Sequence, residues 1–75
     1  MAVYYDRLFR LLNDRGMTGV KLKDAAGISA NILTRLKRNE YISLESIEKI
    51  CNVLDCGVDD ILSFTTIVGI EKDIS

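Results

Sequence analysis

The sequence predicts an all-α fold, a compact domain of five short helices followed by a short extended tail. Of the 75 residues, 48% are apolar, which suffices for the core of one small domain and argues against disorder. Apolar residues recur at spacings of three and four, the period of one helix face. Glycines and helix-capping residues separate these stretches. We therefore expect one helical domain over residues 1–64 and a tail over residues 65–75.

The first two predicted helices lie on either side of Gly16, a residue type that commonly ends a helix. We expect the first helix over residues 3–15 and the second from its N-cap, Thr18, to Ala26. The apolar stripe of the first helix comprises Tyr5, Leu8, Phe9 and Leu12. The inner surface expected for the second helix comprises Val20, Leu22, Ala25 and Ala26.

The third predicted helix, Ala30–Lys37, is the element around which the others are arranged. Gly27 can adopt the left-handed conformation that ends the second helix, and Ser29 is a good N-cap for the third. Ile28 and Leu33 have the spacing of a hydrophobic staple. These signals together predict a turn between two helices and a well-defined start of the second one.

The two faces of the third helix differ in chemistry. At about 100° per residue, one arc is apolar and suited to the core; it consists of Ile32, Leu33 and Leu36. The opposite arc, here called the polar arc, consists of Asn31, Thr34, Arg35 and Arg38. It offers an amide, a hydroxyl and two guanidinium groups and contains no acid. Such groups can address base edges and phosphates, although a solvated helix face is an alternative for the two arginines.

Two further helices complete the predicted core. Ser43 is expected to cap the fourth helix, whose apolar stripe is Ile47, Ile50, Cys51 and Leu54. Gly57 begins a short fifth helix with acids in its first turn, where the helix dipole favours them. The residues expected to close the core after it are Ile61, Leu62 and Phe64. From residue 65 to residue 70, β-branched side chains favour an extended segment.

Charge is segregated along the chain. The net charge of −1 would by itself argue against a nucleic-acid partner. From Arg7 to Arg38, however, eight basic and two acidic residues give a balance of +6, and from residue 39 onward two lysines and eight acids give −6. A polyanion responds to the field within about one Debye length, roughly 8–10 Å, more than to the total charge. The basic half therefore favours a polyanionic partner.

The sequence argues against several other functions. With no histidine and only two cysteines, neither in a CxxC pair, it offers no zinc site and no histidine-dependent nucleophile. It also lacks a glycine-rich phosphate loop, so we expect neither an enzyme nor a cofactor. The first residues are no secretory leader, and no apolar run approaches about 20 residues. We expect a cytoplasmic protein with no membrane partner and no small-molecule substrate.

The order of these elements resembles the Cro/C1-type helix-turn-helix family, also called the XRE family, of bacterial and phage regulators. The matching stretches are LLNDRGMT, LKDAAGIS, ILTRLKRN and SLESIEKICNVLDCGVDDIL, and they cover about residues 5–64. The chain is also similar, more loosely, to small VanU-type regulators found with glycopeptide-resistance operons. The resemblance implies a lambda-repressor-like DNA-binding domain and a role in transcription regulation.

The resemblance also implies where DNA would bind. Residues 21–26 would cross the DNA backbone, and Ala30–Lys37 would be the recognition helix in the major groove. The positions that usually read bases are Ala30, Asn31, Thr34 and Arg35. The positions expected near phosphates are Ser29, Lys37, Arg38 and Asn39.

Lys21 is a further candidate for a phosphate contact, on its own chemistry. A lysine in the first turn of a helix opposes the helix dipole, a cost that is easier to understand if an anion binds there. The family often has a phosphate-binding glutamine at the start of this helix, where this chain has Gly19. Lys23 also replaces a small residue that is usual inside the motif; its stem can lie along the helix with its ammonium group in water.

Two functions remain open from the sequence. The first is a sequence-specific DNA-binding regulator, with Arg35 as the foremost base reader. The second is a protein-interaction module that kept the fold without specific DNA binding and uses the acidic second half and the apolar tail. The basic half favours the first, because a protein-binding module does not need it.

The tail is the candidate joint of a homodimer. One short helix reads only about four base pairs, too few to select one site among the roughly 10⁶ or more competing positions of a genome. A two-fold dimer on two half-sites solves this problem. Residues 65–70 are apolar and β-branched, and a lone strand needs a partner. The alternatives are a frayed end or a strap over its own domain.

Overall fold

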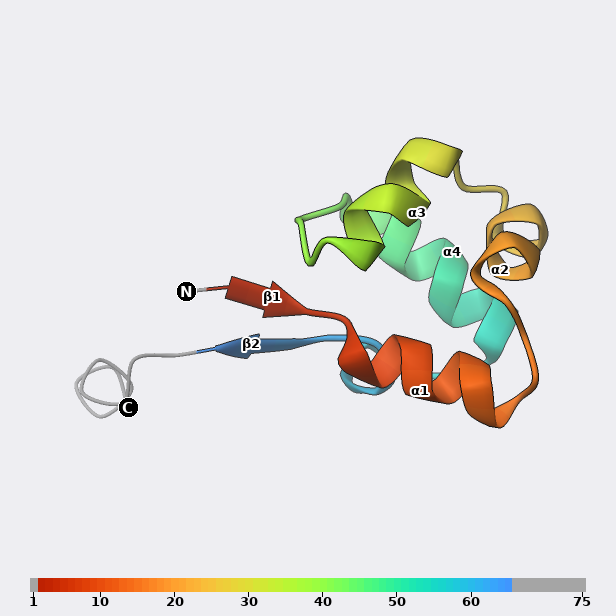
Figure 1. Ribbon diagram of the computed structural model, residues 1–75, viewed down its shortest axis with the longest axis horizontal. Coiled ribbons are helices and arrows are strands. Elements are labelled where there is room, and N and C mark those ends of the chain that lie inside the picture. Colours follow the sequence, from red (N-terminus) through yellow and green to blue (C-terminus); the bar gives the residue numbers. More distant parts are fainter. Residues whose placement is uncertain (1, 66–75) are drawn as a thin grey trace.

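The computed structural model describes residues 2–65. This part of the chain contains four α-helices, one turn of 3₁₀-helix and two short strands (Figure 1). In chain order they are β1 (Ala2–Tyr4), α1 (Asp6–Asp14), α2 (Gly19–Ala26), α3 (Ala30–Lys37), α4 (Leu44–Leu54), η1 (Val58–Asp60) and β2 (Ser63–Thr65). None of the helices in residues 2–65 has the length and hydropathy required to cross a bilayer. The predicted tail from residue 66 onward lies outside the described residues.

The prediction of five helices is not confirmed, and the predicted start of the first helix is wrong. The expected fifth helix is a single 3₁₀ turn, in which the amide of Ile61 donates to the carbonyl of Val58 at 2.9 Å. The first helix begins at Asp6 rather than at residue 3, because residues 2–4 form β1. At the start of the chain, the pairing of residues 2–4 with residues 63–65 overrides the local helical spacing.

β1 and β2 form an antiparallel two-stranded sheet, here called the ribbon, which joins the two ends of the described chain (Figure 1). Val3 lies opposite Phe64, but Val3 is 2% exposed and Phe64 is 55% exposed. The prediction that Phe64 closes the core is therefore wrong, and the fully buried Ile61 closes it. The carbonyl of Ile61 also accepts a hydrogen bond of 3.1 Å from the amide of Leu8, in the first turn of α1.

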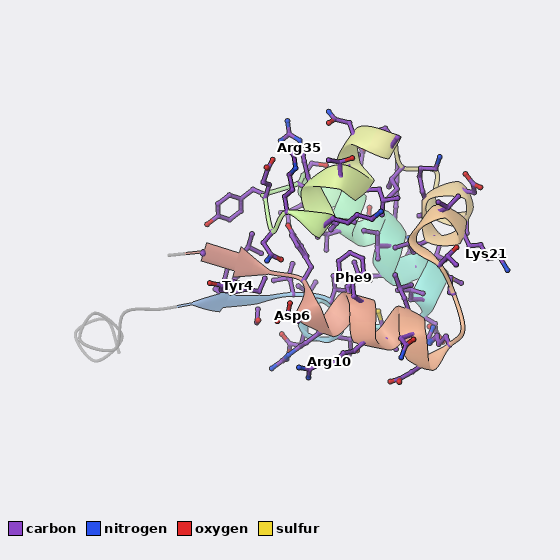
Figure 2. All side chains as sticks on the ribbon, viewed as in Figure 1. Tyr4, Asp6, Phe9, Arg10, Lys21 and Arg35 are labelled. Atoms are coloured by element: carbon purple, nitrogen blue, oxygen red, sulfur yellow. The ribbon has the colours of Figure 1, made fainter. Side chains whose placement is uncertain are left out.

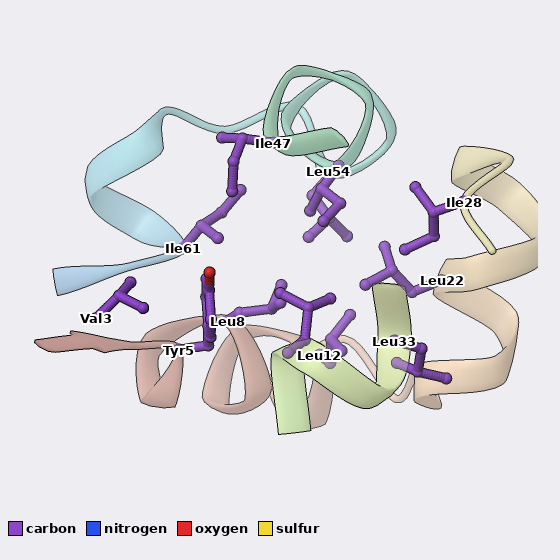
Figure 3. Packing of buried hydrophobic residues seen from close by; sticks show 12 residues of the cluster. Val3, Tyr5, Leu8, Leu12, Leu22, Ile28, Leu33, Ile47, Leu54 and Ile61 are labelled. Atoms are coloured by element: carbon purple, nitrogen blue, oxygen red, sulfur yellow. The ribbon is translucent and has the colours of Figure 1, made fainter. Parts of the chain in front are cut away.

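The core lies between α1 and α4 and is completed by the inner faces of α2 and α3 (Figure 3). Cys51, predicted as a core residue, is half-buried and packs against this cluster. The buried apolar residues are Val3, Tyr5, Leu8, Leu12, Leu22, Ile28, Leu33, Leu36, Ile47, Ile50, Leu54 and Ile61. Most of the predicted stripe residues of α1, α3 and α4 are in this list, so the helical spacing identified the core-facing sides.

The inner face of α2 is narrower than predicted. Leu22 is fully buried and Ala26 half-buried, whereas Val20 is 55% exposed and Ala25 is exposed. Leu22 and Ala26 are four residues apart and share one side of the helix, while Val20 and Ala25 are directed elsewhere. A helix of only eight residues thus contacts the core through a single row of side chains.

The predicted starts of α2, α3 and α4 are confirmed by their hydrogen bonds. The hydroxyls of Thr18, Ser29 and Ser43 each accept a bond from the amide three residues later, at 3.1, 3.2 and 3.2 Å. Gly27, with a φ of 70°, ends α2 in the left-handed conformation. The turn between α2 and α3 is therefore defined on both sides by local side-chain and backbone chemistry.

Candidate nucleic-acid interface

The outer surface of α3 carries the polar arc. Leu33 and Leu36 fasten the inner side of the helix to the core, which directs the opposite side outward. Asn31, Thr34, Arg35 and Arg38 are all exposed. In Figure 2 the side chain of Arg35 points away from the core, at the edge of the molecule formed by α3. The arrangement predicted for the polar arc is therefore present in the structure.

The side chain of Thr34 is oriented by its own helix. Its hydroxyl donates a hydrogen bond of 3.0 Å to the carbonyl of Ala30, one turn earlier. The donor of the hydroxyl is thus used, while the oxygen lone pairs and the methyl group remain accessible. Thr34 can accept a bond from a base amino group or contact a thymine methyl group. The methyl of Ala30, which is also exposed, can make only an apolar contact.

Three cationic side chains flank this surface without neutralising partners. Arg35, Lys37 and Arg38 are exposed at the end of α3, and none forms an ion pair with an acid of residues 2–65. Ser29 lies at the opposite end of the helix. Its hydroxyl oxygen accepts the bond from the helix amide, so its hydrogen is free to donate to a phosphate. Both ends of α3 therefore carry donors suited to the DNA backbone.

Lys21 and Lys23 differ in their surroundings on α2. Lys21 is exposed and points into solvent (Figure 2), and it has no ion pair among the described residues. Lys23 is half-buried and lies 3.7 Å from Asp24, measured from Nζ to Oδ1. Of these two lysines, Lys21 is the one that remains available to a polyanion.

Gly19, the departure from the family pattern, has a packing explanation. A Cβ atom at this position would lie 3.2 Å from Cδ1 of Leu33, which is tighter than an ordinary contact between carbon atoms. The start of α2 thus approaches α3 closely, and a larger side chain would press on Leu33.

Asn39 has a structural role that the sequence did not reveal. It follows α3 in the left-handed conformation, with a φ of 57°. Its side-chain oxygen accepts a hydrogen bond of 3.0 Å from the amide of Tyr5. Its side-chain nitrogen has no hydrogen bond among the described residues, so the phosphate contact expected from the sequence would use that nitrogen.

The basic half of the sequence does not form one basic surface. Arg10, on α1, lies on the opposite side of the molecule from Arg35 (Figure 2). The guanidinium groups of Arg7 and Arg15 donate to the backbone carbonyls of Asp59 and Leu54. Arg7, Arg10 and Arg15 therefore do not extend the polar arc, and the cations on and beside that arc come from the last turn of α3.

Comparison with known proteins places the chain in a family. Residues 7–66 match the family described as the Cro/C1-type HTH DNA-binding domain. Among solved structures, the chain is similar to the crystal structure of the transcriptional regulator VanUg, form II, with a TM-score of 0.81 and 37% sequence identity over 83% of each chain. No curated protein sequence matches it significantly. The arrangement of α2 and α3, the family match and this structural similarity confirm the resemblance: the chain belongs to the Cro/C1-type helix-turn-helix, or XRE, family of DNA-binding domains.

Proposed function

We propose that this chain is a sequence-specific DNA-binding transcription regulator that places α3 in the major groove. The observation that carries the proposal is the exposed, acid-free polar arc on a helix whose other side is fastened to the core. A major groove about 12 Å wide admits an α-helix of this kind. VanUg, the structural relative, is itself described as a transcriptional regulator. The cytoplasmic location expected from the sequence is part of the same proposal.

The proposed base readers are the four positions that the family resemblance indicated. Arg35 can bind guanine bidentately at O6 and N7, and Asn31 can bind adenine at N6 and N7. Thr34 supplies an acceptor or a methyl contact, and Ala30 supplies a methyl contact. Each good bidentate pair discriminates against the wrong base by about 1–3 kcal/mol.

The proposed phosphate contacts surround these readers. Ser29 lies at the start of α3, Lys37 and Arg38 lie at its end, and Asn39 follows. Lys21, on α2, adds a cation that has no ion pair in residues 2–65. Phosphate contacts fix the register of the helix in the groove and make affinity depend on salt.

The proposal includes a homodimer on two half-sites. Within the described residues, the ribbon has only two strands, and such a small sheet leaves edges that can pair with another chain. Phe64 and Tyr4 expose aromatic surface there. The ribbon thus supports the idea that a second copy joins at this end of the molecule. The part of the proposed joint from residue 66 to residue 70 lies outside the described residues.

Sedimentation tests the dimer with a matched pair of variants. Phe64→Ser should shift a dimer toward monomer, whereas Val20→Ser should not, because Val20 is also 55% exposed but lies on α2, away from the ribbon (Figure 1). Truncation after Phe64 tests the rest of the tail in the same way. If the intact chain is a monomer both free and on DNA, the dimer proposal fails.

Selection of bound sequences from a random DNA pool tests the main function. A regulator should enrich a consensus that includes guanine or adenine at positions facing Arg35 and Asn31. If the folded protein enriches no sequence, the protein-interaction module becomes the better account of the chain.

A further inference from the structure

Tyr5 links the start of the domain to the end of α3. It stands between β1 and α1 and is 1% exposed. Its hydroxyl donates a hydrogen bond of 2.7 Å to the carbonyl of Glu40, and its amide donates one of 3.0 Å to the side-chain oxygen of Asn39. One residue thus makes hydrogen bonds to two neighbouring residues just after the recognition helix. We call this group of Tyr5, Asn39 and Glu40 the clamp.

The conformation of Asn39 makes the clamp possible. The amide of Glu40 donates to the carbonyl of Arg35 at 2.9 Å, and the amide of Asn39 donates to the carbonyl of Leu36 at 3.3 Å. These two bonds and the positive φ of Asn39 form a Schellman motif, the usual end of an α-helix. Glycine is the most frequent residue in this left-handed position, and asparagine tolerates it. Glycine there would end the helix but could not bind Tyr5.

The environment of Tyr5 keeps its hydroxyl a donor. Burial raises the pKa of the phenol above its ordinary value, which is far above neutral pH already. The phenol is therefore protonated at neutral pH, and its hydroxyl can donate to the carbonyl of Glu40. A buried polar group that lost this partner would carry a desolvation cost.

The clamp acts on the part of α3 that is proposed to read and hold DNA. Arg35 takes part in the Schellman motif through its carbonyl, and Lys37 and Arg38 lie directly before Asn39. The last turn of a short helix frays readily because its final carbonyls lack helical partners. A bond to Tyr5, 34 residues away in the sequence, anchors this turn to α1 and the ribbon.

We propose that Tyr5 and Asn39 are positioning residues for DNA recognition. The clamp holds the end of α3 at one angle to the rest of the domain, so that Arg35 meets its base while the cations after it meet phosphates. This inference rests on the proposed function. It assigns the oxygen of Asn39 to Tyr5, while the nitrogen of the same amide remains available for a phosphate.

The test compares affinity for the selected DNA site with affinity for unrelated DNA. Tyr5→Phe removes only the hydroxyl. Tyr41→Phe is the matched control, since Tyr41 is an exposed tyrosine whose hydroxyl has no hydrogen bond in the described part of the chain. Tyr5→Phe should lower the ratio of specific to non-specific affinity about three- to tenfold, the scale of one lost hydrogen bond. The control should change it less than twofold.

Two substitutions separate the roles of the Asn39 amide. Asn39→Asp keeps the acceptor for Tyr5 and tolerates the left-handed conformation but removes the nitrogen donor; it should weaken all DNA binding and keep the specificity ratio. Asn39→Gly keeps the conformation but removes the acceptor; it should lower the ratio as Tyr5→Phe does. Amide hydrogen exchange of the last turn of α3, measured without DNA, should accelerate in Asn39→Gly and Tyr5→Phe but not in Asn39→Asp.

The outcomes distinguish this inference from the function on which it rests. If the wild type selects a consensus and both Tyr5→Phe and Asn39→Gly keep its specificity ratio, the clamp only stabilises the fold and the inference is wrong. If the folded wild type selects no consensus, the proposed function fails, and the inference fails with it, whatever the exchange rates are.

Discussion

Two faces of this domain carry arginines. The two faces differ in net charge, because different side chains surround the arginines. Between α1 and η1, basic and acidic side chains share a shallow hollow, lined by Arg7, Arg10, Leu11, Asp14, Asp59 and Asp60. At the end of α3, three cations, Arg35, Lys37 and Arg38, are accompanied in residues 35–40 by one acid, Glu40. The first face is close to neutral, and the second is positive. A basic residue therefore contributes to a positive surface only where the cations around it outnumber the acids.

The largest effect that separates the two faces should come from Arg35. Arg35→Ala should cost about 1–3 kcal/mol of binding to the selected site and relax the base preference at one position. Arg10→Ala removes the same charge from α1. It should leave the affinity for the selected site and the base preference nearly unchanged. Fluorescence titration with the selected site and its single-base variants measures both quantities. An unchanged consensus for Arg35→Ala would make this residue a phosphate contact or a bystander.

On the other face, an arginine should matter for folding and not for DNA. The guanidinium group of Arg15 donates to the carbonyl of Leu54, at the end of α4. Arg15→Ala should lower the free energy of unfolding by about 1 kcal/mol, the typical net value of a hydrogen bond. Urea denaturation measures this loss. DNA affinity per folded molecule should stay within about twofold, and a large loss of affinity would place Arg15 at the interface.

At Ser29, a contribution to folding stability and a contribution to DNA binding can be measured separately. Ser29→Ala should lower the free energy of unfolding by about 1 kcal/mol, because the N-cap of α3 is lost, whereas Ser29→Gly should cost only a few tenths. Both variants remove the hydroxyl proposed to touch a phosphate. Equal losses of DNA affinity in the two, measured well below their unfolding temperatures, would support the phosphate contact. If Ser29→Gly binds DNA as tightly as the wild type, Ser29 only caps α3 and does not contact a phosphate.

The smallest effect should come from a single phosphate contact. Lys37→Ala should weaken binding to all sequences about equally and reduce the slope of log K against log salt by about one unit per half-site. The control is Lys49→Ala on α4, since Lys49 is 3.6 Å from Glu45 and is already paired. Titrations at several salt concentrations give the slopes. A slope that is the same in both variants would contradict the contact by Lys37.

The local parts of the fold were predictable from the sequence. Helix boundaries were predicted correctly from the capping residues Thr18, Gly27, Ser29 and Ser43. Capping depends only on residues three or four positions apart. The apolar stripes of α1, α3 and α4 likewise follow from helical periodicity. The position of the polar arc was predictable for the same reason, since fastening one side of a helix to the core exposes the other.

The parts that the sequence did not reveal depend on distant partners. Val3 was assigned to a helix because nothing near it signals that it lies opposite Phe64. The bond between Tyr5 and Asn39 is also invisible to periodicity and capping patterns. The sequence did contain one signal. Asn39 stands after a helix, in a position where glycine is common, which suggests that its side chain makes a specific contact.

The bond between the amide of Leu8 and the carbonyl of Ile61 bears on how the chain folds during synthesis. On the ribosome, α2, α3 and most of α4 can assemble from neighbouring segments as soon as they emerge. The first turn of α1 has to wait, because the carbonyl that binds its amide and the strand that pairs with β1 come much later in the chain. Contacts of such large sequence separation form slowly. A nascent chain can therefore form its helix-turn-helix before β1 and the first turn of α1 are fixed, and the apolar side of α1 stays exposed until then.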